Sequence, residues 1–215
     1  MKIKLCGVKR LEDILFMNEF KPDYVGFVFA GTKRRLTVPE AAELAAGLNP
    51  DIKKVGVFVD EEPGMVVLAA KQIGLAAVQL HGAEDAPYLK EIRRLLPGTE
   101  IWKAVRVKDA QSIEDALKLP ADLLLLDSFS PFENGGTGIP VNLEAIKNAG
   151  IKRPYFLAGG LNCENIGRIV REMSPCGVDV SSGIETGGIK DRRKIETIMR
   201  ILRGEPPESG KAEQS

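Results

Sequence analysis

The sequence has few of the residues that build metal and disulfide sites. It holds one histidine, His81, and three cysteines, Cys6, Cys163 and Cys176, among 215 residues. Three widely separated cysteines are too few for a disulfide framework, and their spacing does not fit a zinc site. A single histidine also lacks the partners that a metal centre needs. This scarcity argues against a disulfide-stabilised fold and against a bound metal.

Net charge and long apolar runs are also lacking. Lys+Arg and Asp+Glu number 30 each, so the formal net charge is zero. Binding to a phosphate backbone needs a basic surplus, so nucleic acid is not an expected partner. No apolar run approaches the ~20 residues of a membrane span. The N-terminus enters a strand pattern directly and lacks a signal-peptide layout. We therefore expect a cytoplasmic enzyme or binding protein with no membrane partner.

What is present is a regular alternation of short apolar runs and amphipathic helical patterns. The clearest run is the four leucines 123–126, which end in Asp127. Such a run is typical of a strand buried on both faces, as in parallel sheets. The Thr-Val-Pro-Glu segment at 37–40 has the spacing of a capping box with proline in the first turn, which predicts a helix start. In the first helix the pattern places Leu11, Ile14 and Leu15 on one face.

Eight strand–helix units follow one another at nearly even spacing, which predicts an α/β fold with a parallel sheet. Eight units in one chain of this length favour closure into a single-domain (β/α)8 TIM barrel over residues 1–203, although a doubly wound open sheet remains the structural alternative. Residues 204–215 are rich in Pro, Glu and Ser and are expected to be a disordered tail. The predicted strands are 3–6, 24–29, 55–59, 77–80, 101–105, 123–127, 155–158 and 178–180, and the predicted helices are 10–20, one from 37, 63–73, 85–96, 111–119, 141–149, 162–171 and 191–202.

Two residues at predicted strand ends are candidates for proton transfer, because the active site of this fold lies at the C-terminal ends of the strands. Asp127 ends the sixth strand, and a carboxyl in an apolar barrel mouth can act as a general acid. It could instead organise a loop or cap a helix. Cys6 ends the first strand and could act as a general base or nucleophile if a nearby cation favours the thiolate. A buried, inert core cysteine is the alternative.

Two glycine- and serine-containing loops follow the last two strands and predict a phosphate site. They hold Gly159 and Gly160 after the seventh strand and Ser181, Ser182 and Gly183 after the eighth. Glycine lets the backbone approach a ligand closely, and the loops after strands seven and eight are the usual phosphate site of this fold.

Three further polar residues have a functional and a structural interpretation. Arg34 could bind a substrate carboxylate through its guanidinium, or belong to a solvated basic loop. His81 fits a hydrogen-bonded rim residue better than a ligand, but it is a candidate substrate contact. Lys103 could form a Schiff base, although an ion-paired lysine is the simpler interpretation. The residues alone thus predict a phosphosugar-handling barrel enzyme with a Cys/Asp acid/base pair.

An ordered set of motifs from about residue 2 to residue 203 resembles the phosphoribosylanthranilate isomerases of tryptophan biosynthesis. The set does not include the tail. Its segments are Lys4-Leu-Cys-Gly7, Val25-Gly-Phe-Val-Phe29, Lys33-Arg34, Val55-Gly-Val-Phe-Val59, Val78-Gln-Leu-His-Gly82, Leu125-Leu-Asp127, Gly135-Gly-Thr-Gly138, Ala158-Gly-Gly-Leu-Asn162 and Gly177-Val-Asp-Val-Ser-Ser-Gly-Ile-Glu185.

The resemblance implies an Amadori rearrangement of an aminoaldose phosphate. Asp127 would protonate the furanose ring oxygen, and Cys6 would remove the C2 proton. Arg34 matches the family arginine near the anthranilate carboxylate, and the two loops match the phosphate site. This chemistry needs no metal or redox cofactor. The partner would be a small phosphosugar, and family members are monomers or homodimers.

The chain departs from the family pattern at Val8-Lys9, where Ile-Thr is usual, and at Arg35, which follows the arginine. Lys9 could lower the pKa of Cys6 or alter the entrance of the site. Three alternatives to the isomerase stay open. They are a related isomerase for another aminoaldose, a Schiff-base lyase using Lys103, and a non-catalytic barrel that binds phosphosugars.

Overall fold

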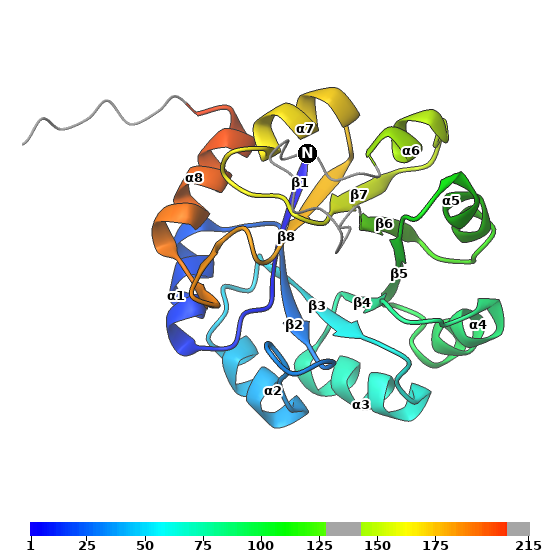
Figure 1. The fold of residues 1–215 in the computed structure, drawn as a ribbon. Helices are drawn as coiled ribbons and strands as arrows, with labels where there is room; N and C mark the ends of the chain where they lie inside the picture. Colours follow the sequence, from blue (N-terminus) through cyan, green and yellow to red (C-terminus); the bar gives the residue numbers. More distant parts are fainter. Residues whose placement is uncertain (128–142, 206–215) are drawn as a thin grey trace, which may run out of the picture.

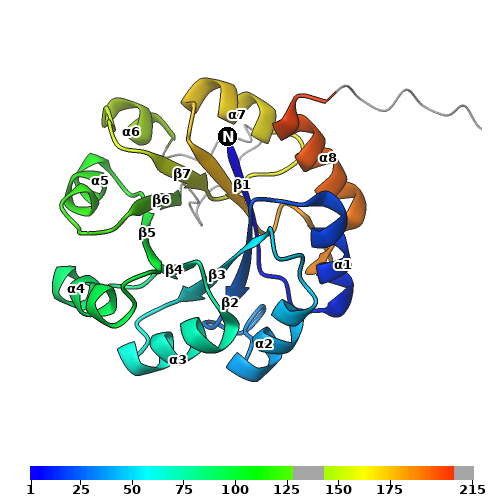
Figure 2. The same cartoon turned by 180° about the vertical axis from the view of Figure 1, so that it is seen from behind.

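A computed structural model describes the protein over residues 1–127 and 143–205. Eight parallel strands close into a barrel in the order β1 to β8, and the helices surround it (Figure 1). The same ring is seen from behind in Figure 2. β1 pairs with β2 on one side and with β8 on the other, so the sheet has no open edge. The predicted (β/α)8 barrel is confirmed, and the open doubly wound sheet is wrong.

The observed elements agree with the predicted ones to within a few residues. The strands are β1 (Lys2–Cys6), β2 (Tyr24–Val28), β3 (Lys53–Phe58), β4 (Ala77–Leu80), β5 (Glu100–Arg106), β6 (Leu123–Asp127), β7 (Tyr155–Ala158) and β8 (Gly177–Val180), and the helices are α1 (Leu11–Phe20), α2 (Val38–Ala46), α3 (Pro63–Ile73), α4 (Ala86–Leu95), α5 (Ala110–Leu117), α6 (Leu143–Asn148), α7 (Ile166–Met173) and α8 (Arg192–Arg203). The capping box of Thr37 and Glu40 at the start of α2 is present as expected.

Two buried layers hold the barrel together. The larger lies between the strands and the helices, and the smaller fills the inside of the barrel. In the inner layer Trp102 packs against Tyr24 and Phe156, with ring centroids 4.9 and 5.0 Å apart. Leu125 and Ala158 belong to this inner layer and also line the cavity above it. The packed interior therefore forms the floor of the site.

The apolar face predicted for α1 is confirmed at Ile14 and wrong at Leu11 and Leu15. Ile14 and Met17 are buried, whereas Leu11 and Leu15 are 63% and 66% exposed. The two leucines lie one turn apart on an exposed face of the helix. Packing against the barrel buries Ile14 together with Met17 and leaves the two leucines outside.

The start of α7 and a small hairpin also differ from the prediction. Asn162 does not begin a helix. Its side-chain oxygen accepts the N–H groups of Glu164 and Asn165 in a turn, and α7 begins at Ile166. Between β8 and α8 lies a two-stranded antiparallel hairpin, β9 (Glu185–Thr186) and β10 (Ile189–Lys190). Its turn residues Gly187 and Gly188 both have positive φ, the pairing that tight hairpin turns need.

Three sequence predictions fall wholly or partly on residues that the structure does not describe. They are the glycine-rich run at 134–138, the first two residues of the helix predicted over 141–149, and all but the first two residues of the predicted tail, 206–215. Within the described part of the chain, no helix is both long and apolar enough to cross a membrane.

Candidate active site

A cavity of about 550 Å³ opens at the C-terminal ends of the barrel strands. The site residues proposed from the sequence line this cavity, with two exceptions. Gly183 lines an adjoining hollow with Gly160 and Ser182, and Lys103 lies outside the cavity lining. The residues in the cavity wall are Cys6, Arg34, His81, Asp127, Gly159, Gly160, Ser181 and Ser182. The closed barrel thus gathers side chains that lie as much as 176 positions apart in the 215-residue chain.

A hollow of similar volume, about 540 Å³, lies near the N-terminal end of β1. The distribution of unpartnered polar atoms distinguishes the two. Among the described residues, three buried side-chain atoms have no hydrogen-bond partner, namely Gln79 Oε1, His81 Nε2 and Asp179 Oδ1. All three residues line the cavity at the C-terminal end and none lines the other hollow. Buried polar atoms without partners are unfavourable unless a ligand or water satisfies them, so they indicate a binding site.

Cys6 ends β1 and is buried, with its thiol packed over Gly26 of β2. A Cβ atom on Gly26 would lie 2.5 Å from Cys6 Sγ and 3.1 Å from Lys4 Nζ, so this position requires glycine. Burial raises the pKa of the Cys6 thiol, and Asp179 adds to that effect, while the ammonium groups of Lys4 and Lys190 oppose it. The net direction is upward, so the resting group is a thiol that becomes a strong base when it loses its proton.

A buried ion pair lies directly below the thiol. Lys4 is 0% exposed, and its ammonium contacts the Asp179 carboxylate at 2.8 Å. The two residues are register partners on β1 and β8. Burial alone would lower the pKa of Lys4, but Asp179 and Cys6 more than offset this and the pKa is raised. Sequence reasoning missed this pair, although a lysine in the middle of a buried strand was a signal that a buried partner exists.

Asp127 and His81 approach each other across the cavity from the ends of β6 and β4. His81 Nε2 lies 3.5 Å from Asp127 Oδ2, slightly longer than an N–H···O hydrogen bond. About a fifth of each side chain is exposed, so both can contact a molecule in the cavity. The strand between them is β5, whose Arg106 is the register partner of Asp127.

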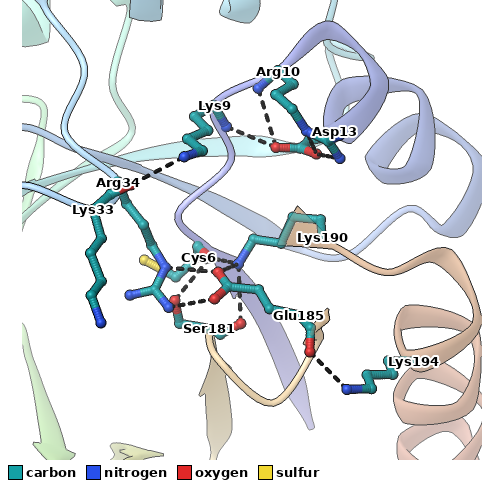
Figure 3. A network of polar contacts seen from close by, with 10 residues as sticks. All are labelled: Cys6, Lys9, Arg10, Asp13, Lys33, Arg34, Ser181, Glu185, Lys190 and Lys194. Carbon is teal, nitrogen blue, oxygen red and sulfur yellow. Dashed lines mark hydrogen bonds and ion pairs between the residues drawn. The ribbon is translucent and has the colours of Figure 1, made fainter. Parts of the chain in front are cut away.

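Arg34 makes a bidentate pair with Glu185 (Figure 3). Arg34 Nε and Nη2 donate to the two carboxylate oxygens at 2.7 and 2.6 Å. The buried Lys190 ammonium donates to the same carboxylate and to the main-chain oxygens of Cys6 and Ser181, at 2.8, 2.6 and 3.1 Å. Burial alone would raise the pKa of Glu185, but Arg34 and Lys190 lower it to about 2. The sequence analysis did not assign a role to Glu185 or Lys190. The adjacent glycines 187 and 188 are typical of a tight hairpin turn and could have indicated the hairpin that carries both residues.

The two predicted phosphate loops meet side by side. Gly159 and Gly160 have φ values of +90° and +64°, which favour glycine. Gly183 bridges to Asn162 of the other loop, and a Cβ on it would lie 1.8 Å from the Leu161 carbonyl oxygen. The Ser181 hydroxyl donates to the Cys6 carbonyl at 3.1 Å, so in this structure it braces β1 against β8.

The other residues singled out from the sequence lie at the margin. Lys9 and Arg35 are both exposed, and the Lys9 ammonium contacts the Lys33 carbonyl at 3.2 Å. The lysines whose charges oppose the rise in the pKa of Cys6 are instead Lys4 and Lys190. Lys103 is ion-paired with Glu84 at 2.7 Å and does not line the main cavity. Over residues 1–127 and 143–205, no cluster of three His, Cys, Asp or Glu side chains could hold a metal ion.

Comparisons with known proteins identify the family to which this barrel belongs. The family model for N-(5'phosphoribosyl)anthranilate (PRA) isomerase matches residues 3–200. The N-(5'-phosphoribosyl)anthranilate isomerase of Acetivibrio thermocellus is 43% identical over 93% of this chain and 94% of its own, and that of Thermoanaerobacter sp. strain X514 is 40% identical over 95% and 98%.

Solved structures of the same enzyme superimpose on the barrel. The isomerase from Thermotoga maritima has a TM-score of 0.83 at 34% identity and covers 95% of this chain and 99% of its own. A phosphoribosyl anthranilate isomerase in complex with reduced 1-(o-carboxyphenylamino)-1-deoxyribulose 5-phosphate has a TM-score of 0.79 at 34% identity and the same coverage. The chain therefore belongs to the N-(5'-phosphoribosyl)anthranilate isomerase family, whose members are enzymes of tryptophan biosynthesis.

Proposed function

We propose that this chain carries out the Amadori rearrangement of N-(5-phosphoribosyl)anthranilate with Asp127 as general acid and Cys6 as general base. The observation that carries the assignment is that both groups line one cavity at the C-terminal ends of β1 and β6. The substrate must lose a proton at one sugar atom and gain one at another. Two groups on different strands can reach two different atoms of one sugar.

The rearrangement proceeds through ring opening, loss of the C2 proton and tautomerisation. Asp127, as the carboxylic acid, gives its proton to the furanose ring oxygen while the bond between that oxygen and C1 breaks. The anthranilate nitrogen supplies the electron pair for the new C=N bond, giving an iminium ion. The Cys6 thiolate then takes the C2 proton, and the electrons of that C–H bond form the C1=C2 bond of a neutral enolamine. The enolamine tautomerises to the aminoketose, so the product is an isomer of the substrate.

The electrostatics of Cys6 fit a base that acts from a small reactive population. Burial keeps the pKa of the thiol above its ordinary value, so the thiolate has a high proton affinity when it forms. The Lys4 ammonium and the Lys190 ammonium both favour that thiolate. Lys190 also donates to the Cys6 carbonyl at 2.6 Å, which fixes the end of β1.

The remaining cavity residues are assigned to binding. Arg34 would contact the anthranilate carboxylate, and the loops holding Gly159, Gly160 and Ser182 would accept the phosphate, with Gly183 and Ser181 keeping those loops in place. Supporting this, the two loops are bridged to each other and one is braced against β1. His81 Nε2 and the unpartnered acceptors of Gln79 and Asp179 face the same space and would contact the sugar hydroxyls and the reacting groups.

The test is a steady-state assay that follows the loss of fluorescence of freshly prepared phosphoribosylanthranilate. Cys6→Ala and Asp127→Asn should each lower kcat by ~10²–10⁴, because each removes one proton-transfer group. The matched controls are Cys176→Ala, a cysteine that lines neither the cavity nor the adjoining hollow, and Asp122→Asn, beside the other end of β6. They should retain near-wild-type turnover. Full activity in either cavity variant would remove that residue from the mechanism.

The observations favour this assignment over a Schiff-base lyase. Lys103 donates to Glu84, to the Gly82 carbonyl and to the Leu80 carbonyl, so its amine is engaged on all sides. It also lies outside the main cavity lining. Borohydride should therefore trap no substrate adduct on Lys103.

A cytoplasmic location, a small phosphosugar as the partner and a monomeric or dimeric state complete the proposal. A Thermotoga maritima isomerase of the family is dimeric.

A further inference from the structure

We propose that Glu185 is a positioning residue, which holds the Arg34 guanidinium in the orientation that binds the substrate carboxylate. The proposal deepens the function assigned above and rests on the carboxylate-binding role given there to Arg34. Glu185 is not expected to contact the substrate itself. It acts through Arg34, from a hairpin that follows the last strand of the barrel.

The contact between the two side chains fixes more than the position of a charge. Nε and Nη2 of Arg34 form one edge of the planar guanidinium, and both donate to Glu185. A bidentate pair of this kind sets the plane and the rotation of the group. Engagement of that edge turns the third nitrogen, Nη1, away from Glu185. Within the described part of the chain Nη1 donates to no protein acceptor (Figure 3). Arg34 also lines the cavity.

Glu185 is itself held in place and is not a mobile counter-ion. Its side chain is 8% exposed, and Lys190, across the hairpin, donates to it at 2.8 Å. Lys190 also donates to the Cys6 and Ser181 carbonyls, which lie at the ends of β1 and β8. The carboxylate that orients Arg34 is thus anchored to the strand that carries the proposed base. Because Glu185 is shared between two cations, it neutralises the Arg34 charge only in part.

The stem of Arg34 is confined on its other side by Gly7. A Cβ on Gly7 would lie 2.3 Å from Arg34 Cδ and 3.2 Å from Arg34 Nε. Gly7 has a φ of +81°, which also favours glycine there. The side chain therefore runs between the backbone after β1 and the hairpin carboxylate. The substrate carboxylate would bind the guanidinium on its remaining side, through Nη1.

The experiment compares two substrates that share the reacting atoms and the phosphate. They are N-(5-phosphoribosyl)anthranilate and N-(5-phosphoribosyl)aniline, which lacks the carboxylate. The readout is the kcat/KM value for the anthranilate substrate divided by that for the aniline substrate. A variant that is partly unfolded loses both activities equally, so the ratio reports carboxylate recognition and is insensitive to a purely structural loss.

Glu185→Gln, which keeps the shape and removes the charge, should lower this ratio about tenfold, because the guanidinium is no longer held in a bidentate pair. Glu185→Asp, which withdraws the carboxylate by one methylene, should lower it by a smaller factor. The matched control is Glu19→Gln, because Glu19 also pairs through both oxygens with an arginine, Arg192, far from the cavity. Its ratio should equal that of the wild type.

Arg34→Ala tests carboxylate binding by Arg34 separately from its positioning by Glu185. This variant should lower the ratio about 10- to 100-fold. If Arg34→Ala keeps the wild-type ratio, the carboxylate role of Arg34 fails, and the inference about Glu185 fails with it. If Arg34→Ala lowers the ratio while both Glu185 variants leave it unchanged, only the positioning role is overturned. A ratio that rises in Glu185→Gln also overturns it, because Glu185 would then compete with the substrate carboxylate.

Discussion

Replacing Lys4 by methionine tests the buried ion pair beneath Cys6. Lys4 is wholly buried and pairs with Asp179, which is 9% exposed. Methionine fills a similar volume without the charge, so the Asp179 carboxylate would stay buried with its main partner removed. Removing one partner of a buried pair costs about 3–5 kcal/mol. For a chain of this size each kcal/mol lowers Tm by about 2–4 °C, so Tm should fall by about 6–20 °C.

The assay is urea unfolding at pH 7 followed by circular dichroism, with four proteins in a double-mutant cycle. These are the wild type, Lys4→Met, Asp179→Asn and the double variant. The double variant removes both charges, so it should be more stable than the sum of the single losses predicts, by at least about 2 kcal/mol. The pair lies 175 positions apart in the chain, so this coupling reports the closed barrel.

Lys2→Met is the matched control on the same strand. Lys2 pairs with Asp23 at 2.6 Å, but its side chain is 60% exposed, so water screens the pair and its loss should cost far less stability than the loss of Lys4. If Lys4→Met costs no more than Lys2→Met, or if the cycle shows no coupling, then the buried pair does not hold β1 and β8 together as described.

Three further predictions follow from the same site. In a Cys163→Ser/Cys176→Ser background, thiolate absorbance at 240 nm should appear with a midpoint above pH 9.0, because burial raises the pKa of Cys6; a midpoint below 9.0 contradicts this. Glu185, whose pKa falls from 4.5 to about 2, stabilises the fold by at most about 3 kcal/mol above pH 4.5. The unfolding free-energy gap between wild type and Glu185→Gln should therefore shrink between pH 4.5 and 2. Gly183→Ala should raise KM about tenfold through its clash with Leu161, whereas Gly98→Ala, which has open space, should not.

The sequence by itself determined the repeating architecture. Periodicity is a local property, and eight strand–helix units could be placed because each unit carries its own apolar pattern and caps. The fold then dictates that all strand ends meet at one edge, so Cys6, Asp127 and the two glycine loops could be assigned to one site before any contact was known.

The tertiary structure decided which residues pair across the barrel. Arg34 was predicted to be a carboxylate clamp, but its partner Glu185 lies 151 positions away and belongs to a hairpin that the pattern did not predict. Lys4 and Asp179 meet only because closure brings β1 against β8. The buried face of α1 was likewise settled by packing, since Leu11 and Leu15 are as apolar as Ile14 yet face solvent. Sequence periodicity specifies faces and ends, whereas long-range partners depend on the register of the closed sheet, which no local pattern encodes.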